Sequence, residues 1–155
     1  MILEKKLAKI LTAKKLTIST AESCTGGLLA SRLTDISGSS GYFLGGFITY
    51  SPKTKEKSLK ISRKLIVKYG TVSKECAKEM AKNVKMLTDS DISLSTTGIT
   101  GPLAIENKKI GEVYIGLAAD KKTIVKKYNF SGTRRQIKHK AVSSALELLE
   151  EYLCQ

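Results

Sequence analysis

The stretch that decides the fold runs from Thr20 to Lys55 and reads TAESCTGGLLASRLTDISGSSGYFLGGFITYSPKTK. It places hydroxyls, a carboxylate, a thiol, paired glycines, a tyrosine and a lysine in one predicted strand–helix–strand passage. Residues 17–21 have the composition of a buried strand, and residues 26–34 have the apolar spacing of a helix. The polar segment 22–27 (ESCTGG) therefore lies at a strand end. Ligands bind at such strand ends because the following helix presents free N–H groups.

Outward from this stretch, helices and strands alternate along the whole chain. Further helices are predicted at 2–14, from Pro52, from Ser62 to Tyr69, after Ser73 and from Thr133, and further strands at 43–50, 91–97, 112–119 and 123–130. The last two strands are joined by a tight turn at 120–122 and form a hairpin, which makes the sheet mixed. We predict one α/β domain over residues 1–155, a three-layer α/β/α fold with a mixed, mostly parallel five-stranded sheet.

Length and hydrophobic content predict a soluble cytoplasmic protein. The 155 residues, 41% of them hydrophobic, are enough for one real core. No run approaches the roughly 18 apolar residues that span a bilayer, and the first 16 residues lack the continuous apolar segment of a signal peptide. We therefore expect no membrane association.

The cysteines and the single histidine argue against metal, disulfide and Ser-His-Asp chemistry. Cys24, Cys76 and Cys154 are far apart and form no C-x-x-C pair. His139 lies inside the last predicted helix, away from every candidate loop. We expect no metal site and no cofactor, and we interpret Cys24 as a small buried hydrophobe.

The net charge of +13 raises the question of a nucleic-acid partner. The charge is mostly lysine, is spread along the chain, and is accompanied by only 6% aromatic residues and no recognised nucleic-acid motif. Nucleic acid is therefore an unlikely partner. The same charge would draw a small anionic substrate toward the protein.

Three loops are expected to converge at the sheet: 22–27, 37–41 together with 50–55, and 96–102. Without a histidine, a hydroxyl nucleophile needs another base, and a lysine with a lowered pKa can serve, often with a tyrosine as relay. Lys55 follows Tyr50 by five residues, so both could reach one pocket. By spacing alone, however, the favoured interpretation of Lys55 is one more solvated lysine, because more than twenty other lysines compete.

The hydroxyls and the arginine also have structural interpretations. Ser23 and Thr25 could simply cap the following helix, and Ser40 could shape a turn. Arg134 at a helix N-terminus is unfavourable for the helix dipole, which favours an anion contact there.

Five motifs together resemble one family. They are TAESCTGG at 20–27, GSS at 38–40, GFITYS at 46–51 with Lys55, TGITGP at 97–102, and GTRR at 132–135. This set resembles the CinA C-terminal domain family, the bacterial nicotinamide-nucleotide amidohydrolases. The resemblance runs from about residue 3 to residue 153 and looks like the stand-alone form of the family.

The resemblance implies a metal-independent and cofactor-independent reaction of pyridine nucleotide recycling. Nicotinamide mononucleotide would be deamidated to nicotinate mononucleotide and ammonia. The motifs carry over as catalytic residues Ser23, Ser40, Tyr50 and Lys55, and as substrate-binding residues Glu22, Thr25, Gly26, Gly27, Thr97, Gly98 and Arg134. Either Ser23 or Ser40 would be the nucleophile, with Lys55 as base and Tyr50 in the relay.

One segment departs from the family pattern. Where relatives continue with several glycines, residues 103–109 read LAIENKK, which are bulkier. The alternative function is therefore a catalytically weak or inactive CinA-like module that binds a nucleotide or takes part in competence and DNA-damage responses. Self-association as a homo-oligomer is also left open.

Overall fold

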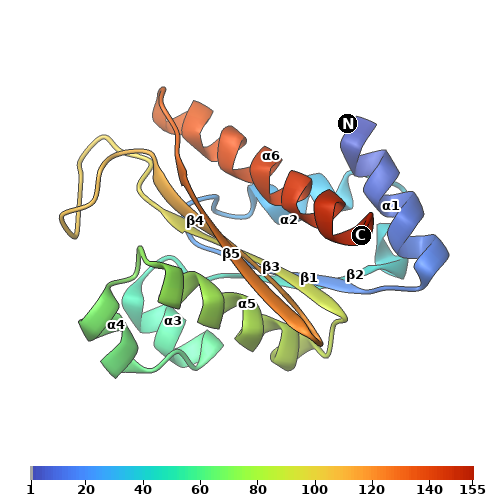
Figure 1. Cartoon of the computed structure of the whole chain (residues 1–155), viewed down its shortest axis with the longest axis horizontal. Coiled ribbons are helices and arrows are strands. Elements are labelled where there is room, and N and C mark those ends of the chain that lie inside the picture. Colours follow the sequence, from blue (N-terminus) through green and yellow to red (C-terminus); the bar gives the residue numbers. More distant parts are fainter. Residues whose placement is uncertain (1) are drawn as a thin grey trace.

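The computed structural model describes residues 2–155, which fold around one five-stranded sheet of order β2-β1-β3-β4-β5 (Figure 1). The strands are β1 (Ile18–Glu22), β2 (Phe43–Ile48), β3 (Ile92–Gly98), β4 (Glu112–Ala119) and β5 (Lys122–Asn129). The helices are α1 (Ile2–Lys14), α2 (Leu28–Thr34), the short η1 (Ser39–Gly41), α3 (Pro52–Leu59), α4 (Arg63–Tyr69), α5 (Lys74–Thr88) and α6 (Arg134–Leu153).

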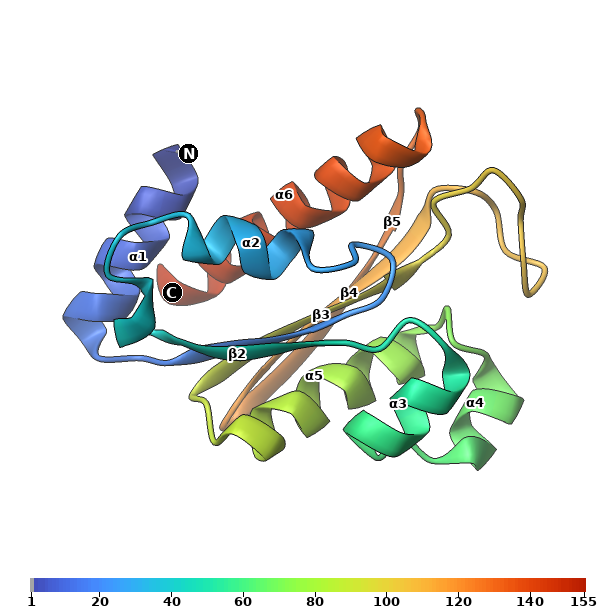
Figure 2. The same cartoon turned by 180° about the vertical axis from the view of Figure 1, so that it is seen from behind.

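The predicted three-layer architecture and mixed sheet are confirmed. Helices α1, α2 and α6 cover one face of the sheet, and α3, α4 and α5 cover the other (Figures 1 and 2). Strand β1 pairs in parallel with both β2 and β3, whereas β4 is antiparallel to β3 and to β5. Four strands therefore run in one direction, and only β4 opposes them.

Alternation along β1 assigns its side chains to the two layers. Ile18 joins the main core with α1, α2 and α6, while Ala21 packs in a second core with residues of α3 and α5. Because successive strand residues point to opposite faces, Ser23 is directed to the α3/α5 face and Glu22 to the α2 face. This placement separates the roles of two adjacent polar residues.

Two predicted boundaries near the candidate site differ from those observed by two residues. Helix α2 begins at Leu28 rather than at residue 26, because Gly26 (φ 59°) and Gly27 (φ 97°) adopt the left-handed conformation and form a turn. Strand β2 ends at Ile48 rather than at Tyr50, and Ser51 then caps α3 through a capping box with Thr54.

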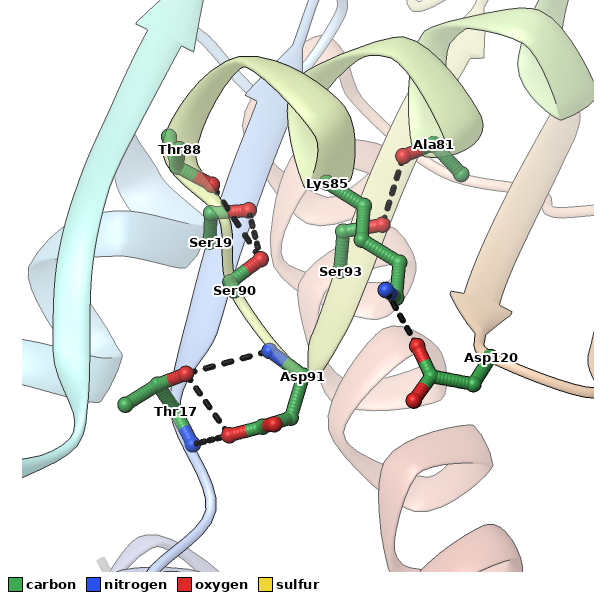
Figure 3. A network of polar contacts seen from close by, with 9 residues as sticks. All are labelled: Thr17, Ser19, Ala81, Lys85, Thr88, Ser90, Asp91, Ser93 and Asp120. Carbon is green, nitrogen blue, oxygen red and sulfur yellow. Dashed lines mark hydrogen bonds and ion pairs between the residues drawn. The ribbon is translucent and has the colours of Figure 1, made fainter.

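A network of polar contacts joins the amino ends of β1 and β3 (Figure 3). Asp91 Oδ2 accepts hydrogen bonds from the backbone N–H of Thr17 (2.7 Å) and from its hydroxyl (2.8 Å). Beside it, the hydroxyls of Ser19 and Ser90 lie 2.8 Å apart. The polar side chains at this edge of the sheet therefore bind one another. The predicted site lies at the opposite edge.

None of the helices in residues 2–155 combines the length and the apolar character that a bilayer-crossing segment requires.

Candidate functional site

The carboxyl ends of β1, β2 and β3 bring together the predicted loops 22–27 and 96–102 and the 50–55 part of the remaining loop. The N–H of Ser23 donates to Thr96 O (2.9 Å), and the N–H of Thr49 donates to Glu22 O (2.8 Å). The ladder thus continues one residue beyond β1 and β2. It fixes the backbone of Ser23 between the two neighbouring strands.

Lys55 reaches this edge from α3 and is completely buried. Its Nζ lies 3.0 Å from Ser23 Oγ and donates to Thr49 O at 2.6 Å. One anchor carbonyl and one hydroxyl therefore fix the amine. The interpretation of Lys55 as a solvated surface lysine is wrong, because α3 folds back over the α5 face instead of projecting into solvent.

The surroundings of Lys55 favour the neutral amine. Burial lowers the pKa of Lys55 below its usual value, while Cys76, Cys24 and Glu106 act in the opposite direction. Burial also raises the pKa of Cys24 to about 12 and that of Cys76 to about 11. Both thiols are therefore protonated and uncharged near neutral pH, which agrees with the interpretation of Cys24 as a buried hydrophobe.

Glu22, predicted to bind substrate, is turned to the other face and caps α2. Its carboxylate accepts from the N–H groups of Gly27 (2.9 Å), Leu29 (3.1 Å) and Ala30 (2.8 Å). It also accepts from the Thr25 hydroxyl (2.6 Å). Four donors leave this side chain occupied, so its role in the fold is to hold the turn that follows Ser23.

Thr25 and its partner Thr96 lie on the same face as Glu22. Thr25 is fully buried, and its hydroxyl lies 2.7 Å from that of Thr96. Sequence reasoning missed Thr96, and only the strand pairing shows that it belongs to this cluster. Gly26 and Gly27 border the cluster through their turn backbone.

Tyr50, the residue after Thr49, forms a second group with Arg134. Arg134 donates from one guanidinium nitrogen to the Tyr50 hydroxyl (2.7 Å) and from another to Gly101 O (2.5 Å). Tyr50 is 59% exposed, and its hydrogen-bond partner is Arg134 rather than Lys55 or Ser23. The Tyr50 hydroxyl is thus bound to Arg134, and Tyr50 forms part of the pocket wall.

Two hollows meet at Arg134. The first, here called the Tyr50 pocket, has a volume of about 240 Å³ and is lined by Tyr50, Arg134, residues 98–103 and Ile105. The second, the basic cavity, has a volume of about 560 Å³ and is lined by Leu28, Arg134, Arg135, Lys138 and His139. A larger hollow of about 700 Å³ between α1 and residues 35–38 contains none of the predicted site residues.

Ser40 does not join the site within this chain. It lies in η1, before the first residue of β2, whereas Lys55 follows the last residue. Because β2 runs parallel to β1 with Phe43 opposite Ile18, the 37–41 loop lies at the amino edge of the sheet. The expected convergence of three loops is wrong for this loop, since consecutive loops of a parallel strand lie at opposite edges.

Thr97 and Gly98 are placed close to the site but in supporting positions. The Thr97 side chain is buried, and its hydroxyl donates to Thr71 O at 2.7 Å. A Cβ at Gly98 would lie 2.6 Å from Val113 Cγ2, so glycine permits the close approach of β3 to β4. Gly98 also lines the Tyr50 pocket.

A residue that sequence reasoning did not single out is Glu106, in the loop 99–111 between β3 and β4. Its carboxylate accepts from Thr71 N–H (3.1 Å), Thr71 Oγ1 (2.6 Å) and Val72 N–H (3.0 Å). The only sequence signal was the unusual composition of residues 103–109. That composition marked the loop without indicating where its carboxylate would bind.

Among residues 2–155, no group of three or more His, Cys, Asp or Glu side chains is arranged to hold a metal ion. The three cysteines are free, with Cys24 and Cys76 buried and Cys154 exposed.

Comparison with known proteins gives a consistent family assignment. The profile of the CinA C-terminal domain matches residues 1–153. A CinA-like protein of Endomicrobium trichonymphae is 49% identical over 94% of this chain and 34% of its own length. A protein of Thermoanaerobacter pseudethanolicus, named as competence-damage inducible, is 44% identical over 97% of this chain and 37% of its own length. The chain thus spans little more than a third of these curated relatives.

Solved structures give the same answer at the level of the fold. The competence damage-inducible protein A of Klebsiella pneumoniae superposes with a TM-score of 0.96 at 29% identity, covering 99% of this chain and 96% of that one. The competence/damage-inducible protein CihA of Agrobacterium tumefaciens has a TM-score of 0.94 at 32% identity, covering 99% and 94%. The chain belongs to the CinA C-terminal domain family.

Proposed function

We propose that the protein is a metal-independent amidohydrolase that deamidates nicotinamide mononucleotide to nicotinate mononucleotide and ammonia. The observation that carries this proposal is the fully buried Lys55 amine, 3.0 Å from Ser23 Oγ. A lysine whose pKa is lowered by burial can act as the general base for a serine nucleophile. Family membership supports the choice of reaction.

In this proposal the nucleophile is Ser23, since Ser40 lies at the opposite edge of the sheet. Neutral Lys55 accepts the Ser23 hydroxyl proton while Oγ forms a bond to the amide carbonyl carbon. The resulting lysine ammonium then protonates the departing nitrogen as the C–N bond breaks and ammonia leaves. Water attacks the acyl-serine with the help of the same base and regenerates both side chains.

The negative charge on the substrate oxygen needs donors at the strand-to-helix turn. Within residues 2–155, the turn N–H groups of Ser23 and Gly26 already bind Thr96 O and Ser23 O. Those of Cys24 and Thr25 form no backbone hydrogen bond there. They are the proposed oxyanion donors, next to the nucleophile.

The pockets suggest how the nucleotide would lie. Tyr50 and the apolar Leu103 and Ile105 offer a surface for the pyridine ring in the Tyr50 pocket. The adjoining basic cavity offers Arg135, Lys138 and His139 to the phosphate, with Arg134 between the two hollows. None of these three basic residues forms an ion pair with a carboxylate in the described chain.

The decisive experiment measures ammonia release from nicotinamide mononucleotide by the purified protein. Wild type should turn over, and Lys55→Met should lose at least ~10³-fold in kcat. Circular dichroism of Lys55→Met checks that the variant folds. Absence of turnover in folded wild type would exclude the amidase and favour the non-catalytic nucleotide-binding alternative, which tight binding without hydrolysis would support.

A further inference from the structure

The loop 99–111 is tied down at two separated points. Near its start, Gly101 O accepts a hydrogen bond from Arg134 of α6. At its tip, Glu106 binds the segment just before α5 through Thr71 and Val72. The residues between these two ties include Leu103 and Ile105, which line the Tyr50 pocket.

The backbone conformation at the loop tip does not favour glutamate, so the contacts of the side chain explain why Glu106 occurs there. Glu106 (φ 54°) and Asn107 (φ 56°) both adopt the left-handed conformation. Asparagine tolerates this region, but glutamate has no backbone preference for it, and each such residue costs about 1 kcal/mol or more. The three hydrogen bonds of the carboxylate offset that cost.

The segment before α5, residues 70–72, leaves room for the Glu106 carboxylate. Gly70 (φ 80°) precedes Thr71, and a Cβ there would lie 2.5 Å from Glu106 Oε2. Thr71 O in turn accepts the Thr97 hydroxyl from β3. The contact therefore links the loop tip, the lead-in to α5 and the end of β3 in one chain of hydrogen bonds.

The hydrogen bonds of the clamp favour the ionised carboxylate. Partial burial acts to raise the pKa of Glu106, but its hydrogen bonds with Thr71 and Val72 and the charge of Lys55 outweigh this and lower the pKa.

We propose that Glu106 is a positioning residue, which clamps the loop 99–111 so that Leu103 and Ile105 wall the pyridine pocket. The clamp is a matter of structure, while its catalytic consequence rests on the proposed function. Loss of the hydrogen bonds would free the pocket wall.

The clamp is tested without any assay of activity. Hydrogen exchange should show protected amides at Thr71 and Val72 in wild type and faster exchange there in Glu106→Ala, by roughly tenfold or more. Glu147→Gln, on the exposed surface of α6, is the matched control and should leave both amides unchanged. Unchanged protection in Glu106→Ala would overturn the clamp, whether or not the protein is an amidase.

The effect on the pocket is tested by the separation of KM from kcat. A freed pocket wall weakens the hold on the pyridine ring but leaves Ser23 and Lys55 in place. KM should therefore rise while kcat stays nearly unchanged.

The variant for this test is Thr71→Val, which removes the shortest hydrogen bond of the clamp. It should raise KM roughly threefold to tenfold. An unchanged KM in Thr71→Val, with wild-type turnover intact, would overturn the effect on the pocket and leave the proposed function standing.

Discussion

Adjacent residues at the end of β1 serve opposite faces of the sheet, and this explains why ESCTGG is so dense in polar groups. Ser23 lies against Lys55 on the α3/α5 face, while Glu22 caps α2 on the other. A strand alternates its side chains, so one short segment can supply both the reactive hydroxyl and the support for its turn. Substitution of Ser23 should therefore affect activity, whereas substitution of Glu22 should affect stability.

Exchange of either serine for alanine distinguishes the two candidate nucleophiles. Ser23→Ala should abolish ammonia release, because it removes the only hydroxyl bonded to Lys55 Nζ within the described chain. Ser40→Ala should keep activity within about twofold of wild type, because surface substitutions away from a site are nearly neutral. A loss of activity in Ser40→Ala equal to that in Ser23→Ala would contradict the assignment.

Glu22→Gln should act on stability. The amide supplies one acceptor oxygen in place of two and turns an NH₂ group toward backbone donors. We expect a loss of about 2–4 kcal/mol in the free energy of unfolding, measured by urea denaturation. The exposed Glu147→Gln should change stability by less than about 0.5 kcal/mol. Equal stability of the two variants would show that the carboxylate is not needed as a cap.

For single residues, the sequence indicated which side chains belong to the site better than it indicated where those side chains point. Motif resemblance identified Lys55 and Ser23, and the structure brings these two together. Orientation could not be predicted for Glu22 or Thr97, because it depends on strand register. Glu106 was not predicted, because it contacts the segment before α5, 35 residues earlier in the chain. No local sequence pattern indicates a contact between residues so far apart.

Among the elements, α5 decides how closely the second helical layer approaches the sheet. Its backbone carbonyls at Ala77 and Ala81 accept hydrogen bonds from the hydroxyls of Ser95 and Ser93, both at 2.6 Å. Figure 3 shows the contact between Ser93 and Ala81. Serines on β3 thus replace the larger apolar residues that would hold the helix farther away. The same helix carries Cys76, one of the groups that face Lys55.

Gly116 on β4 makes this close approach possible. An added Cβ would lie 2.5 Å from Ser95 Oγ and 2.8 Å from the Ala77 carbonyl oxygen. Gly116→Ala should therefore destabilise the protein by about 1–3 kcal/mol, measured as a shift of the denaturation midpoint. Gly45→Ala on β2 is the control, since its Cβ would meet nothing within 4 Å. A Gly116→Ala protein as stable as the Gly45→Ala protein would refute this packing argument.

Elements were predicted well where hydrophobic period and turn chemistry agree. The hairpin of β4 and β5 and the capping box of Thr133 and Gln136 are both present. The predicted start of α2 was wrong because two glycines in the left-handed region extend the turn. The order of strands in the sheet could not be derived from local patterns, and that order decides which loops meet.

For the whole molecule, the net positive charge acts on an anionic substrate before that substrate enters the site. The net charge of +13 includes the unpaired cluster of the basic cavity, beside the proposed active site. An anionic substrate is attracted over a Debye length of about 10 Å at 0.1 M salt. Binding steps should therefore respond to ionic strength more than the chemical step does.

Salt dependence tests this view directly. For nicotinamide mononucleotide, kcat/KM should fall roughly tenfold between about 0.01 M and 0.5 M NaCl, with kcat nearly constant. The corresponding riboside lacks the phosphate and should show no such fall. A parallel decline for both substrates would indicate a general effect of salt on the protein rather than phosphate attraction.

The burial of Lys55 also has a consequence for chemical labelling. The chain has 27 basic residues, of which four are arginines, which leaves 23 lysines, and Lys55 alone among them is buried. An amine-reactive reagent would acylate the other lysines in the folded protein but would reach residue 55 only when α3 detaches from the sheet. Acylation at this one position would then measure how often the chain opens. The burial that lowers the pKa of Lys55, and so favours the neutral amine that can accept a proton, also protects that amine from reagents in solution.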